Sequence, residues 1–440
     1  MSLLVYGVSI RGNGHYASGQ ECQDRNSFEE SDFSKDKVKV AAMADGHGGA
    51  PYFRSAEGAA LAVKKAKEIL HDFVEKNKGD LDKISKLETE IQRTEAVKNS
   101  ISDFQDVPSI GLLVYSSING KSDSQEKISA LKTKIQNDLK ELPDIIVKEW
   151  KKEIDSKIKE NPVKVAEIEI TSPVGCEKFT GYAEESDGFL KMITVNLSQS
   201  HIERVRRKKY EIYGSTLIAA ARYNDHNFVI QIGDGKVVFL EKDGEISFPI
   251  PEQENQIGNA TNSICQDDAA ERFVTDYSYK PLNMIMETSD GVSNAVDSDG
   301  KLGEVADLIY NSFYEDPDTF RKEIKPFLRQ FSEASSDDCT LCMIADVDEK
   351  AFESLKKQSE CEEDSSELEL LYKPPFAFLG DNLEKAFIKY RIETLFNGTD
   401  EENIEYKYGK ITKIDKNEIF FENMSTDEYS DSLKDCGFDV

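Results

Sequence analysis

Acidic side chains stand at five places where apolar stretches of this sequence end or begin. At three of these places glycine follows the acid directly. A single acid in such a position usually belongs to a turn or a helix cap. An uncompensated carboxylate beside a buried strand is costly, so a set of them needs a different explanation. We expect these side chains to converge on a shared positive charge. The acids are Asp24, Asp45, Asp234, Asp290 and the adjacent pair Asp337 and Asp338.

Divalent metal ions are the natural partners of such a cluster. Crowded carboxylates repel one another unless cations lie among them, and hard ions such as Mg²⁺ or Mn²⁺ prefer oxygen ligands. Two ions about 3.5 to 4 Å apart can share one carboxylate and activate a water between them. This arrangement commonly serves phosphoryl hydrolysis, which is therefore the chemistry that the acids suggest.

Composition limits the classes of protein to which the chain can belong. It has 440 residues, of which 38% are hydrophobic and 32% charged, so we expect either one large core with insertions or two domains. The formal net charge of -29 argues against nucleic acid and anionic membranes as partners. No basic-apolar signal pattern and no apolar run of membrane-spanning length is present, so we predict a cytoplasmic protein.

The cysteines do not indicate a disulfide framework or a metal site. Seven of them are spread along the chain. Cys339 and Cys342 form a C-x-x-C pair, but the surrounding "CTLCMIADV" is typical of a buried strand and no second pair or histidine follows.

The elements that must position the acids fall into two groups of strands around a helical block. Up to about residue 60, short apolar strands alternate with glycine-rich turns, and a helix is predicted at about 53 to 77. Between about 80 and 160, apolar residues recur at helical spacing in two long amphipathic segments. The apolar stretch "VPSIGLLVYSSINGKSD" is predicted to be a break between them. The two helices could form a hairpin that lies on the core or projects from it.

Strands return after about residue 163. The segments "VKVAEIEIT", "STLIAAARY", "NFVIQIGDGKVVFLEKDGEIS" and "NMIMETSDG" are predicted strands separated by turn dipeptides. Helices at about 302 to 313 and 317 to 333 precede a last strand, "TLCMIADV". Strands on both sides of a helical block indicate one discontinuous domain, residues 1–348, with an insertion at about 65–162.

The C-terminal part is predicted to be separate from this domain. Residues 349–372 form an acidic, serine-rich linker, and residues 373–440 form a small α/β module. In this module we expect a helix at "NLEKAFIKYRIETLF" and a hairpin at "YKYGKITKIDKNEIFF". Elsewhere, the basic run at 204–209 is interpreted as a solvated helix end, with an acidic phosphopeptide or the acidic tail of the chain as alternative contacts.

An ordered set of motifs resembles a known family. "ADGHGG", "YGSTLIAA", "IGDGK", "TSDGV" and "SDDCT" follow one another as they do in the type-2C metal-dependent protein serine/threonine phosphatases. The resemblance covers about 1–60 and 163–348. It implies an α+β fold, a four-layer α-β-β-α sandwich of two antiparallel sheets flanked by helices, here with a helical insertion and a small C-terminal module.

The resemblance also implies a set of metal ligands. Asp45 would bridge two Mg²⁺ or Mn²⁺ ions, and the carbonyl of Gly46 would bind one of them. Asp290 and Asp337 would complete the other, with Asp337 preferred over its neighbour because the family's ligand stands three residues before a threonine.

Two further acids have less direct roles by the same resemblance. Asp24 would reach a metal directly or through water, and Asp234 matches an acid sometimes linked to a weaker third ion. Asn294 stands where the family often has an acid, so a third ion would be held less well.

Histidines are the candidates for proton transfer and phosphate binding. His47 corresponds to the family's general acid, a role that a near-neutral pKa suits, with a structural hydrogen bond as the alternative. Gly19 replaces the arginine that usually clamps the substrate phosphate. The loop "GNGHYASGQECQD" resembles a bacterial-type branch in which His15 could make this contact, with Arg11 or Arg25 as alternatives. The Gly214-Ser215-Thr216 segment is interpreted as strand packing without a chemical role.

The sequence thus predicts a protein serine/threonine phosphatase that acts on a phosphorylated protein, with a further protein partner at the helical insertion or the C-terminal module. Two alternatives stay open at this point. One is a non-catalytic binding or scaffold protein with the same fold, and the other is a phosphatase of a small phosphorylated metabolite. The presence of every expected metal ligand favours an enzyme.

Overall fold

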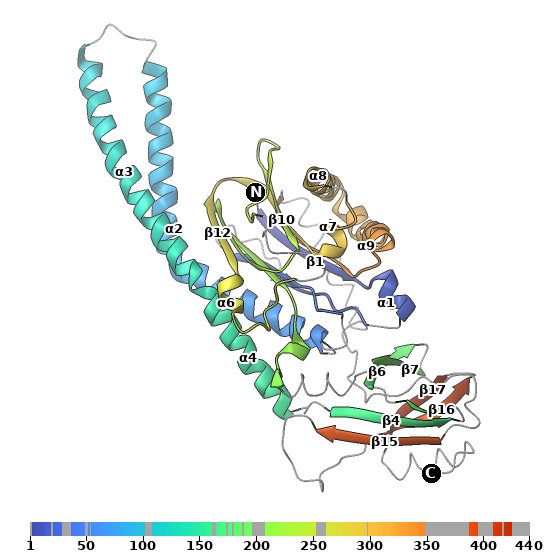
Figure 1. The fold of residues 1–440 in the computed structure, drawn as a ribbon. Helices are drawn as coiled ribbons and strands as arrows, with labels where there is room; N and C mark the ends of the chain where they lie inside the picture. The colour runs from blue at the N-terminus through green and yellow to red at the C-terminus, as the bar shows by residue number, and fades with distance from the viewer. Residues whose placement is uncertain are drawn as a thin grey trace.

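Two five-stranded antiparallel sheets form the centre of the computed structural model (Figure 1). In the first, the strand order is β1 (Ser2–Ile10), β14 (Cys339–Val347), β13 (Leu282–Thr288), β10 (Lys236–Glu241) and β11 (Ile246–Ser247). In the second, it is β12 (Val274–Tyr279), β9 (His226–Ile232), β8 (Leu217–Tyr223), β3 (Lys39–Ala44) and β2 (Arg25–Phe28). The structure describes residues 2–18, 21–28, 37–48, 52, 54–101, 108–160, 164–172, 175–177, 180–186, 189–195, 207–251, 261–296, 298–347, 387–394, 408–415 and 418–424.

The sheets pack face to face through alternating apolar side chains. On β13, Ile285 joins the cluster between the sheets, whereas Met284 and Met286 belong to the cluster on the outer face. Such alternation is what a strand covered on both faces requires. The strands β3, β8 and β9 are buried along their whole length, which explains their nearly continuous apolar sequences.

Helices cover the outer faces of both sheets. α8 (Asp299–Glu315) and α9 (Pro317–Ser335) pack on the first sheet, and the N-terminal part of α2 (Ser55–Ile101) packs on the second. Asp316 caps α9 by accepting a hydrogen bond from the Thr319 backbone nitrogen at 3.1 Å. The shorter helices are α1 (Asn13–Ser18), α6 (Ala269–Arg272) and α7 (Asp290–Ser293). The predicted four-layer α-β-β-α sandwich is therefore confirmed.

The helical insertion differs from its prediction in two respects. α2 is one continuous helix of 47 residues, where two helices were expected, and α3 (Pro108–Lys140) includes the stretch that was predicted to be a break. Single glycines such as Gly79 and Gly111 cost a helix only about 1 kcal/mol each, which the surrounding strong helix formers offset. The two helices project well beyond the sheets (Figure 1). We call 80–101 and 108–140 the helical arm.

The arm is joined to the core at its base. Leu81, Ile84 and Ile91 of α2 and Ile128 and Ile135 of α3 are buried in the same cluster as the outer face of the second sheet. α4 (Leu142–Glu160) then returns along α2, where the fully buried Trp150 donates from Nε1 to the carbonyl of Gly58 at 3.0 Å. The predicted amphipathic spacing is thus confirmed, and α4 belongs to the core packing.

The segment "VKVAEIEIT" forms a strand, as predicted, but the first strands after the arm lie outside both central sheets. β4 (Lys164–Ser172) pairs with β5 (Gly175–Glu177) and with β15 (Phe387–Thr394) from the C-terminal region. β6 (Thr180–Ser186) and β7 (Phe189–Val195) form a separate antiparallel pair. Long-range pairing of this kind leaves no trace in local sequence, so the strand could be predicted but its partners could not.

The C-terminal region contains a strand where a helix was predicted. Residues 387–394, within "NLEKAFIKYRIETLF", form β15, and their alternation of Ile388, Tyr390 and Ile392 with charged residues has the period of a strand. The predicted hairpin is confirmed as β16 (Tyr408–Asp415) paired with β17 (Glu418–Met424). The acidic linker at 349–372 lies outside the described residues, and the domain boundaries stay a prediction.

No helix among the described residues is both long enough and apolar enough to cross a membrane.

Candidate metal centre

The predicted acids come together at one edge of the sandwich because each stands at the end of a strand. Asp45 directly follows β3, Asp234 lies in the turn between β9 and β10, and Asp290 opens α7 after β13. Carboxylate oxygens of these three residues lie within 4.8 Å of one another. Asp24 precedes β2, and Asp337 precedes β14. Five separate strand ends thus supply acids to one region of the sandwich.

Several of these carboxylate oxygens are buried without a hydrogen-bond partner among the described residues. They include both oxygens of Asp24, Oδ1 of Asp234 and Oδ1 of Asp290. The Thr340 hydroxyl, which lies toward Asp24, donates instead to Ser9 Oγ at 2.7 Å. Buried carboxylates normally have partners, and an oxygen-only donor set suits Mg²⁺ or Mn²⁺. The residues therefore fit the metal ions that the sequence implied.

The acids oppose one another's ionisation. Burial raises the pKa of Asp45 well above its usual range, and the charges of Asp24, Asp290 and Asp337 raise it further. Burial, with the charges of Asp234 and Asp337, raises the pKa of Asp290 to about 6. Closely spaced carboxylates behave in this way when nothing compensates them. Cations among them would reverse the effect.

A segment before β8 holds Asp45 in position. The Asp45 backbone nitrogen donates to Thr216 Oγ1 at 3.0 Å, and the Thr216 nitrogen donates to the Asp45 carbonyl at 2.8 Å. His47 N donates to the Gly214 carbonyl at 3.1 Å. The sequence analysis treated this segment as packing only and missed its positioning role. The local signal of this role is the threonine of "GST", which stands directly before a strand.

Glycine is required after Asp45 for steric reasons as well. A Cβ atom at Gly46 would lie 2.8 Å from the carbonyl oxygen of Gln23 and 3.0 Å from the Ser55 backbone. Contacts this short would displace backbone on both sides. Gly46 therefore lets the loop with Asp45 lie against the loop with Asp24.

His47 lies in a more apolar setting than expected. Burial lowers the pKa of its imidazole to about 4, although the charge of Asp234 acts in the opposite direction. Its ring meets Tyr52 edge to face, with ring centroids 4.9 Å apart. The predicted near-neutral pKa is therefore wrong, and the imidazole of His47 is neutral at pH 7.

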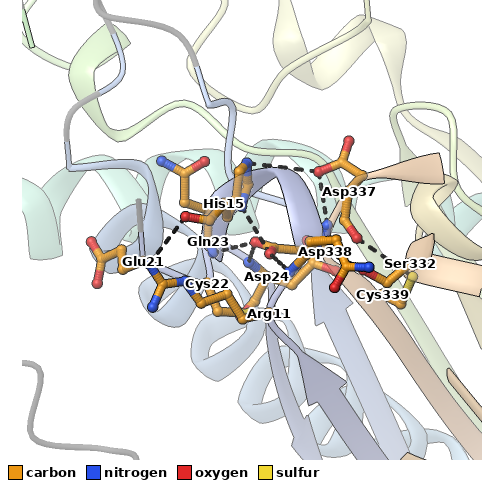
Figure 2. Close-up of polar contacts among 12 residues, drawn as sticks. Arg11, His15, Glu21, Cys22, Gln23, Asp24, Ser332, Asp337, Asp338 and Cys339 are labelled. Carbon is orange, nitrogen blue, oxygen red and sulfur yellow. Dashed lines mark hydrogen bonds and ion pairs between the residues drawn. The ribbon is translucent and has the colours of Figure 1, made fainter. Parts of the chain in front are cut away.

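The adjacent acids Asp337 and Asp338 face different surroundings (Figure 2). Asp338 is only 2% exposed and accepts hydrogen bonds from the Gly12 nitrogen at 2.6 Å, the Gln23 nitrogen at 2.6 Å and His15 Nδ1 at 2.8 Å. Asp338, just before β14, thereby links the loop after β1 to the loop before β2. The Asp337 side chain is 46% exposed, and its Oδ1 accepts a hydrogen bond from the Asp338 nitrogen at 2.8 Å.

Burial alone would raise the pKa of Asp338, but the hydrogen bond and charge of His15 and the backbone donors outweigh it and lower that pKa. A carboxylate held in this way is a structural group. Asp337, in contrast, has a pKa that burial raises, and its charge adds to the repulsion within the cluster.

His15 lies beside the acids, whereas Arg25 does not face them. His15 Nε2 is 3.9 Å from Asp337 Oδ1 (Figure 2). Burial lowers the pKa of His15, but Asp338, Asp337 and Asp24 together raise it above its usual value. Arg25 Nη1 donates to the carbonyls of Cys22 at 2.6 Å and Asp24 at 2.8 Å.

Arg11, the other alternative, donates from Nη2 to the His15 carbonyl at 3.1 Å. Of the three phosphate-binding candidates, His15 therefore has the position closest to the cluster, and the two arginines support its loops.

Two polar residues orient the remaining acids. Thr261 donates its hydroxyl to Asp234 Oδ2, and Asn294 Nδ2 donates to Asp290 Oδ2 at 3.2 Å. Thr261 was missed by the sequence analysis because nothing in its local sequence distinguishes it. Cys339 and Cys342 are free and buried in β14, as the strand interpretation predicted.

A sandwich with a cluster of buried carboxylates at one edge fits a metal-dependent phosphatase. A family model described as protein phosphatase 2C matches residues 11–341, and the chain belongs to this family of serine/threonine phosphatases. Membership implies a phosphoric monoester hydrolase. A comparison with curated proteins finds no match.

Several solved structures are similar to the chain at low identity. A serine/threonine phosphatase of S. agalactiae is 13% identical, with 78% of this chain and 99% of that chain covered and a TM-score of 0.35. Serine/threonine phosphatase Stp1 from Staphylococcus aureus is 11% identical, with coverages of 79% and 96% and a TM-score of 0.35. RsbX in complex with magnesium is 11% identical, with coverages of 78% and 95% and a TM-score of 0.32.

Proposed function

We propose that the chain is an active protein phosphatase that hydrolyses phosphoserine and phosphothreonine at a site for two Mg²⁺ or Mn²⁺ ions. The observation that supports it most is the convergence of Asp45, Asp234 and Asp290, with orphaned buried oxygens, in a chain of the protein phosphatase 2C family. When bound, the ions would supply Lewis-acid charge and lower the pKa of the attacking water.

The residues of the chain divide the work of holding these ions. Asp45 would bind both, because it lies between the acids of the other strands, and the carbonyl of Gly46 would bind one. Asp290 and Asp337 would hold the second. Asp24 is fully buried behind them and would act directly or through water. Asp234, fixed by Thr261, would serve a weaker third ion.

Two histidines would act on the substrate. His15 presents Nε2 toward the cluster while Asp338 accepts from Nδ1, so the protonated ring, in which both nitrogens are donors, could donate a hydrogen bond from Nε2 to a phosphate oxygen. His47 would hold or donate a proton at the leaving oxygen. A phosphate dianion close to the ring would raise the low pKa of His47 and favour this role.

The test is hydrolysis of a generic aryl phosphate, a phosphothreonine peptide and a sugar phosphate with Mn²⁺, each with and without chelator. We expect metal-dependent turnover of the aryl phosphate and the peptide. Turnover of the sugar phosphate alone would favour a metabolite phosphatase, and no turnover of any substrate would favour a binding protein.

Asp45→Asn tests the bridging role with little change of shape. The amide cannot offset two adjacent dications, so turnover should fall at least about a thousandfold, or roughly 4 kcal/mol of activation free energy. Asp243→Asn is the matched control, because Asp243 belongs to an exposed acidic group on the β10–β11 turn. Near-wild-type turnover by Asp45→Asn at saturating Mn²⁺ would contradict the proposal.

A further inference from the structure

One edge of α9 carries three exposed cations, Lys322, Lys325 and Arg329. Within the described part of the chain, none of the three has an ion-pair partner. Lys83 and Lys134 of the helical arm differ in this respect, since both pair with Asp80. In a chain with a net charge of -29, unpaired cations in a row are a distinct surface. We call these three residues the cationic edge.

The cationic edge lies on the side of α9 that borders the start of α1, the helix that contains His15. At 100° per residue, the three side chains fall within an arc of about 60°, and Ser332 lies roughly 20° beyond Lys325. Ser332 Oγ accepts a hydrogen bond from the Asn13 nitrogen at 2.9 Å. Ser332, which contacts the start of α1, is therefore next to the three cations on the surface of α9.

A second contact places the end of α9 at the metal centre. The Gly14 nitrogen donates to the Ser336 carbonyl at 2.9 Å, and Asp337 follows directly. Figure 1 shows α9 beside α1, the helix that contains His15. The helix thus leads from the cationic edge to the acids.

The distances suit a peptide substrate. Arg329 and Ser335 are separated by about 9 Å of helix, and Lys322 lies roughly 10 Å further from the centre. An extended peptide advances about 3.3 Å per residue. With its phosphorylated residue at the metal centre, a peptide would bring residues about three to seven positions away beside the cations.

We infer that the cationic edge binds acidic side chains of the phosphorylated protein, so that the enzyme favours phosphorylation sites with Asp or Glu about three to seven residues away. The inference rests on the proposed function and names the substrate class of the same site. Because the chain as a whole carries a formal net charge of -29 and repels an acidic segment, a local row of cations would direct its approach and orientation.

The test compares phosphothreonine peptides of equal length with an acidic segment on the N-terminal side, on the C-terminal side, or on neither. The variant is Lys322→Gln, Lys325→Gln, Arg329→Gln. Exposed ion pairs contribute little individually, so wild type should favour one acidic peptide by about tenfold in kcat/KM, chiefly through KM. The variant should lose this preference and hydrolyse the aryl phosphate at the wild-type rate.

A matched control removes three cations elsewhere, through Lys83→Gln, Lys127→Gln and Lys152→Gln, whose side chains are 67%, 60% and 70% exposed. It changes the net charge equally and should keep the preference. Added salt should reduce the preference of wild type and leave the variant unaffected. Circular dichroism would verify that both variants are folded.

Three outcomes would overturn the inference. The first is an equal preference in wild type and variant, and the second is an equal loss in the control. The third is faster hydrolysis of all peptides by the variant, which would mean that the edge holds the chain's own acidic segment at 349–372. Absence of aryl phosphate hydrolysis by wild type would instead contradict the proposed function.

Discussion

Glu287 is an ionisable residue inside the sandwich, and its substitution gives the sharpest test of the packing. It stands on β13 opposite Val237 of β10 and Cys342 of β14, and it is 1% exposed. Burial raises the pKa of Glu287 to about 8, and the Ala220 backbone offsets this only in part. Neither carboxylate oxygen reaches hydrogen-bonding geometry with a described residue. We predict that Glu287→Gln removes a pH-dependent loss of stability.

The sign follows from the proton balance. The folded chain keeps the Glu287 proton up to about pH 8, whereas the unfolded chain releases it above its usual pKa of 4.5. The unfolded state therefore binds fewer protons in this window, and the free energy of unfolding falls as the pH rises. Each pH unit lowers the free energy of unfolding by about 1.4 kcal/mol, so Glu287 should cost wild type roughly 4 kcal/mol of stability between pH 5 and pH 8.

The assay is urea denaturation at several pH values between 5 and 8, with chelator present. Trp150 is the only tryptophan and is fully buried, so its fluorescence reports on core packing. The other acids are present in both proteins, so their contribution cancels in the difference between the free energies of unfolding of wild type and Glu287→Gln. That difference should grow by roughly 4 kcal/mol in favour of the variant. If the free energy of unfolding changed with pH equally in the two proteins, the reasoning would be refuted, because Glu287 would then not be protonated in the folded chain.

Three further predictions use the same structure. Burial lowers the pKa of His226 to about 4. The free energy of unfolding should therefore fall by roughly 3 kcal/mol as the pH falls from 6.5 to 4, because the unfolded chain binds a proton that the folded chain does not. A His226→Gln variant whose free energy of unfolding falls as much would contradict this. Replacing residues 95–124 of the helical arm by a short Gly-Ser turn should leave aryl phosphate turnover within about tenfold, since none of the proposed ligands lies there. A folded deletion with a larger loss would mean that the arm shapes the site. Truncation after residue 350 should also preserve Mn²⁺-dependent turnover of the aryl phosphate, and a folded but inactive product would show that the domain division is wrong.

The acids of the site could be found in the sequence because strand ends mark them. Asp45, Asp234 and Asp290 each interrupt an apolar run and precede a glycine, and strands that meet at one sheet edge bring such residues together. Their individual roles stay predictions. What the sequence could not supply was the surroundings of each side chain. The depressed pKa of His47 depends on burial by residues distant along the chain, and the positioning role of Thr216 depends on a contact with the loop after β3.

The fold was predictable where local periodicity was strong. The spacing of apolar residues identified most strands of both central sheets and both flanking helices α8 and α9, but β2 and β12 were not among the predicted strands. Residues 387–394 were assigned wrongly because their apolar positions fit a helical spacing and an alternating one about equally well. The pairing of β4 with β15 decided between them, and that contact lies beyond any local window.

This pairing also has a consequence during synthesis. β15 leaves the ribosome roughly 200 residues after β4, which at about 5 to 20 residues per second corresponds to a delay of some 10 to 40 s. Throughout that interval the nascent chain presents β4 without the neighbour that covers one of its edges. A strand edge left open for so long can pair with other nascent chains, so the yield of this protein in cells should depend on chaperones that shield it.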